Sequence, residues 1–292
     1  MLFAALNIPE SKEQIRFFGA IMIISTFFGN ILSAALQNGL TPTEIAFRCI
    51  QSGVTGIDIE EEELDNPNLH YLLDAGMQIT SLIVRRDLLH SSSENVAEEV
   101  VRLAVKYKSP RILMIPGYFK ADDTFSAAEN ALSPLRRICA LAKKENITVG
   151  VEDYDHVAAP TSTISGLNYF LDRIPALSCC FDTGNFIFMA EDVPEAYRML
   201  KHRITAQIHC KDRALTGRDG EMPAHSKAGL DLYPCAVGSG VIPIRDIVCD
   251  LVKNGFDGVL TAELFGSSDT LGDLEKSAGF IKDCIANTKR MD

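Results

Sequence analysis

The stretch Thr148-Val149-Gly150-Val151-Glu152 has a design that recurs at residues 178–182 (Ser-Cys-Cys-Phe-Asp), 205–209 (Thr-Ala-Gln-Ile-His) and 259–263 (Val-Leu-Thr-Ala-Glu). Each is a short, largely apolar run that ends on a side chain able to bind a metal ion. Such runs are typical of buried parallel strands, and a barrel of alternating strands and helices carries its chemistry where the strands end. The pattern predicts a parallel (β/α)8 barrel with four ligands at its mouth: Glu152, Asp182, His209 and Glu263.

The rest of the chain alternates strand-like and helix-like segments. Before residue 148 we expect strands within 20–32 and over 56–59, 77–84 and 111–115, with helices over 41–51, 93–106 and 125–144. Thr41 and Glu44 have the spacing of a capping box. Further helices are expected over 162–171, 193–201, 244–253 and 274–286. Eight strands, each followed by a helix and with few hairpin signals, favour a parallel barrel. A doubly wound open sheet is less favoured, because no Gly-x-Gly-x-x-Gly follows a first strand.

Length and composition are those of one enzyme-sized domain. The chain has 292 residues, of which 47% are hydrophobic and 23% charged, and no Pro/Gly/Ser-rich linker divides it. We therefore expect one domain over residues 1–292, with 1–19 as an N-terminal extension or helix. The net charge of -11, with dispersed basic residues, argues against a nucleic-acid partner.

The cysteines and the first apolar stretch bear on the compartment. Eight cysteines show no Cys-x-x-Cys spacing, which favours reduced thiols in a cytoplasmic protein. Residues 20–32 are too few to span a membrane and include Ser25 and Asn30, so we interpret them as a first buried strand and its loop. A membrane partner is therefore not expected, whereas a homo-oligomer stays open.

The four strand-end side chains suit one divalent cation. Hard ions favour carboxylate oxygens, and one imidazole shifts the preference toward Mn²⁺, Co²⁺ or Fe²⁺. We expect a single divalent cofactor, with Mn²⁺ favoured and Mg²⁺, Co²⁺, Fe²⁺ or Zn²⁺ as alternatives. Two open positions would accept a substrate carbonyl and its neighbouring hydroxyl, so that the ion stabilises an enediolate. Glu152 and Glu263, at opposite sides of the mouth, would remove and return the proton.

Five segments together resemble the signature of the xylose-isomerase-like TIM barrels: residues 151–153, 181–185, 208–212, 237–241 and 261–263. That superfamily includes sugar phosphate isomerases/epimerases, ketose 3-epimerases, inosose dehydratases and type IV AP endonucleases. The resemblance covers nearly the whole chain and is sharp from about Gly150 onward. Its strength is the order Glu, Asp, His-x-Lys-Asp, Gly-x-Gly, Glu on successive strand ends.

The resemblance implies that Glu152 and Glu263 bind the metal and exchange protons with the substrate, while Asp182 and His209 complete the metal shell. Two positions depart from the ketose 3-epimerases: Asn185 replaces a sugar-contacting His, and Ala158 replaces a substrate-binding Glu. These departures argue against that subfamily. Asn185 and a total of six histidines also argue against the trinuclear zinc site of an AP endonuclease.

Loops at a barrel mouth carry specificity, so polar residues there are candidates for substrate contact. The candidates are Asn185, Lys211, Asp212, Arg213, His156 and Glu60. For Lys211 and Asp212 the alternative is a solvated turn, and for Glu60 a solvated helix start. Gly238 and Gly240 would permit a tight loop whose amides could approach a phosphate. The loop around His225 and Lys227 is either a lid or an ordinary exposed loop; the latter is favoured.

These features predict a metal-dependent isomerase or epimerase that acts on a small sugar, sugar phosphate or polyol derivative. One alternative is a lyase of the inosose dehydratase type that uses the same site. Another is a metal-binding or sugar-binding barrel without activity. The sequence leaves the sugar, its phosphorylation and the native metal open.

Overall fold

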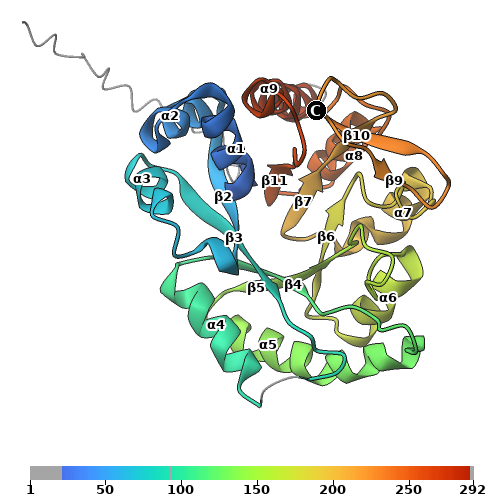
Figure 1. Ribbon diagram of the computed structural model, residues 1–292. Coiled ribbons are helices and arrows are strands. Elements are labelled where there is room, and N and C mark those ends of the chain that lie inside the picture. The colour runs from blue at the N-terminus through green and yellow to red at the C-terminus, as the bar shows by residue number, and fades with distance from the viewer. Residues whose placement is uncertain (1–21, 92–93, 290–292) are drawn as a thin grey trace, which may run out of the picture.

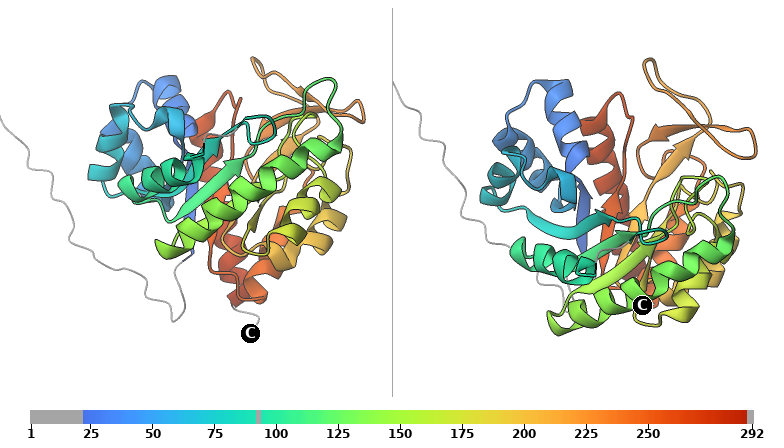
Figure 2. Two further views of the ribbon diagram at one scale, coloured as in Figure 1. Left: turned by 90° about the horizontal axis from the view of Figure 1, so that it is seen from below. Right: turned by 60° about the horizontal axis from the view of Figure 1, so that its bottom comes forward.

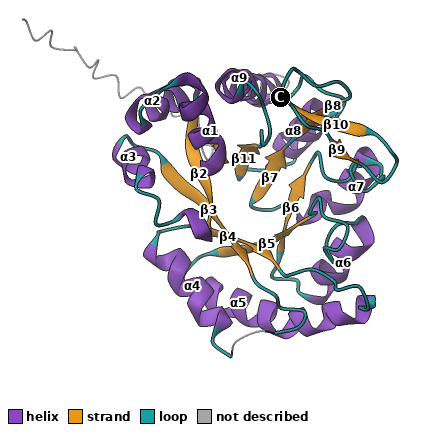
Figure 3. Cartoon of the chain, in the orientation of Figure 1, coloured by secondary structure: helices purple, strands orange, loops and turns teal. Residues whose placement is uncertain are grey.

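A closed parallel barrel of eight strands forms the centre of the molecule, and helices surround it (Figures 1 and 3). The computed structural model describes residues 22–91 and 94–289. The strands follow the order β1-β11-β7-β6-β5-β4-β3-β2, and β1 pairs with both β11 and β2. This closure confirms the predicted (β/α)8 barrel and rules out the open doubly wound sheet.

The barrel strands agree closely with the expected segments. They are β1 (Ile23–Phe27), β2 (Val54–Glu60), β3 (Gln78–Arg85), β4 (Arg111–Ile115), β5 (Thr148–Glu152), β6 (Ser178–Asp182), β7 (Gln207–Cys210) and β11 (Val259–Ala262). One expectation was wrong: no loop follows β1 within residues 20–32, because helix α1 begins directly at Phe28. Phe28 and Ile31 turn into the core, which explains an apolar run longer than one strand. The extension expected at 1–19 lies outside the described residues.

The helices cover the outside of the barrel. They are α1 (Phe28–Asn38), α2 (Pro42–Ser52), α3 (Asn68–Asp74), α4 (Val96–Lys106), α5 (Leu132–Lys144), α6 (Ile164–Arg173), α7 (Val193–Leu200), α8 (Ile244–Lys253) and α9 (Thr270–Lys289). Short 3₁₀ turns occur at Glu61–Glu63, Phe125–Ala131 and Lys201–Arg203. The helix expected over 125–144 therefore begins as a 3₁₀ segment. The capping box of α2 is confirmed, since Thr41 and Glu44 exchange backbone-to-side-chain hydrogen bonds.

A small antiparallel sheet follows β7 and stands at one end of the barrel (Figure 2). It consists of β8 (Asp212–Ala214), β9 (Ala224–His225) and β10 (Asp231–Cys235), in the order β8-β10-β9. We expected only a long loop here. His225 is exposed and pairs with Asp231 across the sheet at 2.7 Å, and the Lys227 amide bonds to the Phe188 carbonyl at 2.9 Å. This segment is therefore an ordered wall beside the mouth.

Two further observations concern membrane-spanning helices and the cysteines. Among the described helices, none is both long and apolar enough to cross a membrane. All eight cysteines belong to the described chain and are free, and six of them are buried among apolar side chains. Their burial fits the interpretation of most of them as small hydrophobic residues.

Candidate metal centre and substrate pocket

Four neighbouring strands bring the predicted ligands together inside the mouth of the barrel. One ligand atom from each of Glu152, Asp182, His209 and Glu263 lies within 4.8 Å of the others, and all four residues are buried. The His209 Nδ1 atom is 2.6 Å from Glu152 Oε1, 3.4 Å from Glu263 Oε2 and 4.0 Å from Asp182 Oδ2. The sequence prediction thus identified side chains that do form one cluster.

The donor set of this cluster fits a divalent cation. Asp182 Oδ2 is fully buried without a hydrogen-bond partner, while the other oxygen of Asp182 accepts from the Gly184 amide at 2.7 Å. Leaving a buried carboxylate oxygen unpaired is costly unless a cation or proton reaches it. Burial raises the pKa of Asp182 well above its usual value, and the nearby Glu263 and Glu152 carboxylates add to the effect. A cation among these oxygens would relieve both costs.

The surroundings shift the pKa values of Glu152 and Glu263 in opposite directions. Burial raises the pKa of Glu152, although His209 opposes the shift. Burial acts in the same sense on Glu263, but the Lys211 ammonium overcomes it and holds the pKa of Glu263 well below its usual range. Lys211 Nζ lies 2.6 Å from Glu263 Oε1, whereas Glu263 Oε2 faces His209. Glu263 could therefore bind a metal ion with Oε2 while Lys211 holds Oε1.

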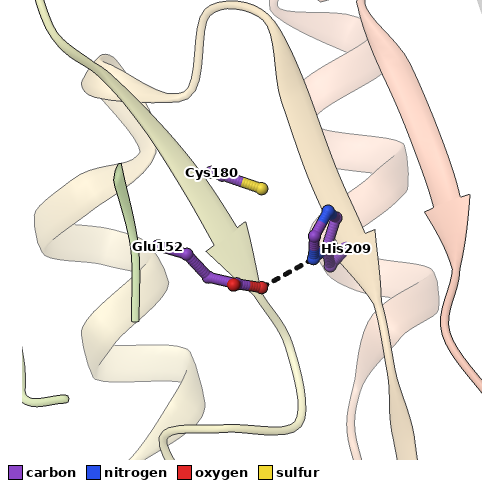
Figure 4. A group of neighbouring side chains, drawn as sticks. All are labelled: Glu152, Cys180 and His209. Carbon is purple, nitrogen blue, oxygen red and sulfur yellow. Dashed lines mark hydrogen bonds and ion pairs between the residues drawn. The ribbon is translucent and has the colours of Figure 1, made fainter. Parts of the chain in front are cut away.

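Cys180 on β6 lies next to the cluster (Figure 4). Its thiol, Glu152 and His209 form a second group whose ligand atoms lie within 4.8 Å of one another. Burial raises the pKa of Cys180 to about 12, so the thiol stays protonated in the absence of a bound metal. Because the four-residue cluster offers three carboxylates, it suits a hard ion better than the thiol group does.

A buried polar network supports His209 from inside the barrel, and the sequence analysis did not identify it. Asp58 on β2 is fully buried, and its Oδ2 lies 3.4 Å from His209 Nε2. Thr80 and Thr261 donate hydroxyl hydrogen bonds to Asp58 at 2.7 and 2.9 Å, and Gln207 donates its amide. This arrangement fixes the ring with Nδ1 toward the cluster, as carboxylates commonly do behind metal-binding histidines. The sequence does contain a signal for Asp58, because it is a charged residue within a largely apolar strand.

A cavity of about 460 Å³ opens above the cluster. Six of its lining residues were predicted site residues: Glu60, Glu152, Asn185, Lys211, Arg213 and Glu263. Arg85, Tyr154 and Asp155 also line it, and the sequence analysis did not single them out. The small sheet contributes Leu232 and Pro234 to the wall. A volume of this size suits a small molecule rather than a polymer.

Every basic side chain in this lining is held by acidic partners. Arg85 makes two hydrogen bonds to Glu60, at 2.5 and 2.7 Å. Asp155 Oδ2 accepts from Lys211 Nζ at 3.0 Å and from Arg213 Nη2 at 3.1 Å. The carboxylates of Glu263 and Asp155 raise the pKa of Lys211 despite its burial, which alone would lower it. The lysine is therefore charged, and its position is fixed.

Two predicted substrate residues do not line the cavity. The His156 ring packs against the Tyr118 ring with centroids 4.7 Å apart, and its Nδ1 accepts from the Ala158 amide at 3.2 Å. The Asp212 carboxylate instead accepts four backbone amides, from Arg213, Gly238, Gly240 and Ile242, at 2.9 to 3.2 Å. The tight loop expected at Gly238 and Gly240 is present, with Gly238 at φ 86°. Its two glycine amides face Asp212.

Asp212→Ala should destabilise the protein, because it leaves several amides of the 238–242 loop without an acceptor. We expect a loss of about 2 to 4 kcal/mol in the free energy of unfolding. Thermal melts should show this as a fall of roughly 3 to 7 °C. Asp219→Ala is the matched control, since Asp219 is exposed in the same segment. Equal melting temperatures for Asp212→Ala and the control would contradict the structural role of Asp212.

Comparison with known proteins places this geometry in a family. The model of the xylose isomerase-like TIM barrel family matches residues 35–284. No curated protein matches the chain. Three solved structures illustrate the likeness, and at such low identities they show the fold alone.

The first is the probable 3-DHS dehydratase AsbF of Bacillus anthracis, with 19% identity, a TM-score of 0.65, and coverage of 89% of this chain and 99% of that one. The second is a xylose isomerase-like TIM barrel protein of Mycobacterium smegmatis in complex with magnesium, with 14% identity, a TM-score of 0.65, and coverage of 92% and 97%. The third is the D-allulose 3-epimerase of a Methylomonas species in complex with D-allulose, with 13% identity, a TM-score of 0.64, and coverage of 91% and 98%. Because the family match spans most of the chain and the barrel agrees with it, this protein belongs to the xylose isomerase-like TIM barrels.

Proposed function

We propose that the protein is a divalent-metal-dependent isomerase or epimerase of a small polyhydroxylated carbonyl compound. One observation carries the proposal: Glu152 and Glu263 belong to the ligand cluster and also line the cavity, whereas Asp182 and His209 lie behind them. Two carboxylates are therefore within reach of a substrate that the ion would hold. We propose Mn²⁺ as the preferred ion, because three carboxylates and one imidazole suit it.

The side chains divide the work by position. Glu152, Asp182, His209 and Glu263 would hold the cation, which would supply a Lewis acid for the negative charge that develops on the substrate oxygens. Glu152 on β5 and Glu263 after β11 are separated in the barrel by β6 and β7, so they flank the cavity. One of them can take the proton from the carbon beside the carbonyl. The other can return a proton, either to the neighbouring carbon in an isomerisation or to the opposite face of the same carbon in an epimerisation. Asn185 lines the cavity, and its side-chain oxygen accepts from Lys211 at 2.9 Å, so Asn185 is held in place to bind a substrate hydroxyl group.

A dehydratase is the second candidate, and it would use the same first step. Loss of the proton next to the carbonyl can be followed by loss of a hydroxyl one carbon further on, provided that a donor protonates the leaving oxygen. The glutamate that does not take the first proton also lines the cavity, and in its protonated form it can act as that donor. The solved structure of AsbF, described as a 3-DHS dehydratase, belongs to a protein of similar fold. Stoichiometric loss of water from the substrate would favour this candidate.

The test is hydrogen exchange in heavy water. Protein loaded with Mn²⁺ should exchange the hydrogen beside the carbonyl in at least one member of a panel of ketoses, aldoses and inososes. After the reaction the ion is removed from the sample, and NMR measures the exchange in the sugar. Exchange should stop when the ion is removed with a chelator and resume when it is restored. Cleavage of abasic-site DNA, without exchange in any of these compounds, would overturn the proposal in favour of a nuclease.

A further inference from the structure

The basic side chains of the cavity raise the question whether the substrate is phosphorylated. We infer that the substrate is uncharged. Glu60 and Asp155 exclude phosphorylated and other anionic sugars, because they form ion pairs with the basic side chains that would otherwise bind the anion. The inference rests on the proposed function for the reaction and adds the substrate class to it. Three sets of contacts support it.

The two terminal nitrogens of Arg85 are not available to bind a phosphate. Its two terminal nitrogens each bond to one oxygen of Glu60, which is the bidentate arrangement that a phosphate would otherwise receive. A third contact, from Nη2 to the Tyr154 hydroxyl at 3.3 Å, fixes the guanidinium further. Glu60 is fixed as well, because its amide donates to Glu63 at 3.2 Å at the start of the 3₁₀ turn.

Lys211 and Arg213 are also engaged. An ammonium group has three donors, and Lys211 Nζ has three partners: Glu263 at 2.6 Å, Asn185 at 2.9 Å and Asp155 at 3.0 Å. Arg213 shares Asp155 with it. The side chains of Lys211 and Arg213 are 9% and 7% exposed, while that of Asp155 is 30% exposed. The charge that faces the cavity opening at this position is thus the acidic one.

Backbone amides provide the third route to a phosphate, and in the described chain the predicted one is taken. The amides of Gly238 and Gly240 both donate to Asp212 Oδ2 at 2.9 Å. A Cβ atom added at Gly240 would lie 2.3 Å from Asp212 Oδ1, so this approach is as close as a glycine allows. The Gly-x-Gly loop therefore holds a carboxylate of the protein itself.

The charges balance without an anionic substrate. The cavity and the metal cluster supply five carboxylates, from Glu60, Glu152, Asp155, Asp182 and Glu263. Three cationic side chains line the cavity, namely Arg85, Lys211 and Arg213. Together with one divalent ion they match the five negative charges, because a metal-bound histidine is neutral. A phosphate group would add negative charge to a buried site in which every cation already has a partner, and this costs binding energy.

Matched pairs of sugars test the inference: D-fructose with D-fructose 6-phosphate, and D-ribulose with D-ribulose 5-phosphate. For the Mn²⁺-loaded protein we expect binding and exchange to favour the neutral member by about tenfold or more, as the cost of one unpaired charge predicts. Inorganic phosphate at millimolar concentration should not raise the melting temperature of the protein. This second measurement needs no turnover.

Variants that free the cations should reverse the preference. Glu60→Gln with Asp155→Asn keeps the shapes and removes two negative charges, so it should gain about tenfold in affinity for the phosphorylated sugars or for phosphate. Glu61→Gln is the matched control: Glu61 makes the same bidentate pair with Arg86, but neither residue lines this cavity. The control should behave as the wild type does.

The outcomes separate the two proposals. A wild-type preference for the phosphorylated member, or stabilisation of the wild type by phosphate that the Glu61→Gln control shares, would overturn the inference while leaving the proposed reaction intact. A folded double variant that gains no affinity for either anion would also overturn it. Absence of exchange in every sugar would instead count against the proposed function, and the melting experiments with phosphate would still decide on the charge of the ligand.

Discussion

Glu152→Gln and Glu263→Gln should each lower turnover on the order of 10²-fold or more, because each removes a group that accepts or donates the transferred proton. Both side chains contribute a ligand atom and line the cavity, so each is within reach of the ion and of the substrate. The amide oxygen of Gln can still coordinate, and we therefore expect part of the metal to be retained. Turnover and metal content should be measured on the same preparations.

The comparison between the two variants adds a second readout. Lys211 lies 2.6 Å from Glu263, so Glu263→Gln frees a buried lysine as well, and we expect it to lower the melting temperature more than Glu152→Gln does. Glu61→Gln, whose partner is Arg86 outside the cavity, is the control for loss of an acidic side chain. Near wild-type turnover in either site variant, with metal bound, would show that its carboxylate has only a structural role.

The barrel was predictable because its signal is local and repeated. Each of β5, β6 and β7 is a short apolar run, and such runs bury both faces of a parallel strand. The small antiparallel sheet gave no such signal. Its strand β9 has only two residues, and β10 contains Pro234, a residue that argues against a strand. The sheet forms because β10 pairs with both β8 and β9, and no single segment reveals these contacts.

The cluster of Glu152, Asp182, His209 and Glu263 was predictable for a related reason: the ends of neighbouring barrel strands must meet at one mouth. The same rule applies to Arg85, which ends β3 beside Glu60 at the end of β2, and it could have identified that pair. Asp155 and Asp212 could not be assigned in this way. The role of Asp212 depends on a glycine loop 26 residues further along the chain, and that of Asp155 on the direction of a loop after β5. Side-chain direction in loops is set by tertiary contacts.

The second large effect concerns the ion itself: protein prepared without chelator should contain close to one divalent cation per chain, and His209→Ala should remove most of it. His209 supplies the nitrogen of the cluster, and its Nδ1 is within 4.0 Å of a carboxylate oxygen from each of the other three residues. Without the imidazole, three buried carboxylates face one another with fewer ligands to hold a cation. Elemental analysis of the purified protein measures the content directly.

Two variants determine whether this loss is specific to the cluster. His202→Ala removes an exposed histidine of the 3₁₀ turn Lys201–Arg203 and should retain the wild-type metal content. Asp58→Asn keeps all four ligands but weakens the group behind His209 Nε2, and loss of such a support typically costs about 10- to 100-fold in metal affinity. Metal content should therefore decrease in the order wild type, Asp58→Asn, His209→Ala. If His209→Ala retains a full ion while His202→Ala loses it, the cation binds elsewhere, and the four-residue cluster is not the metal centre.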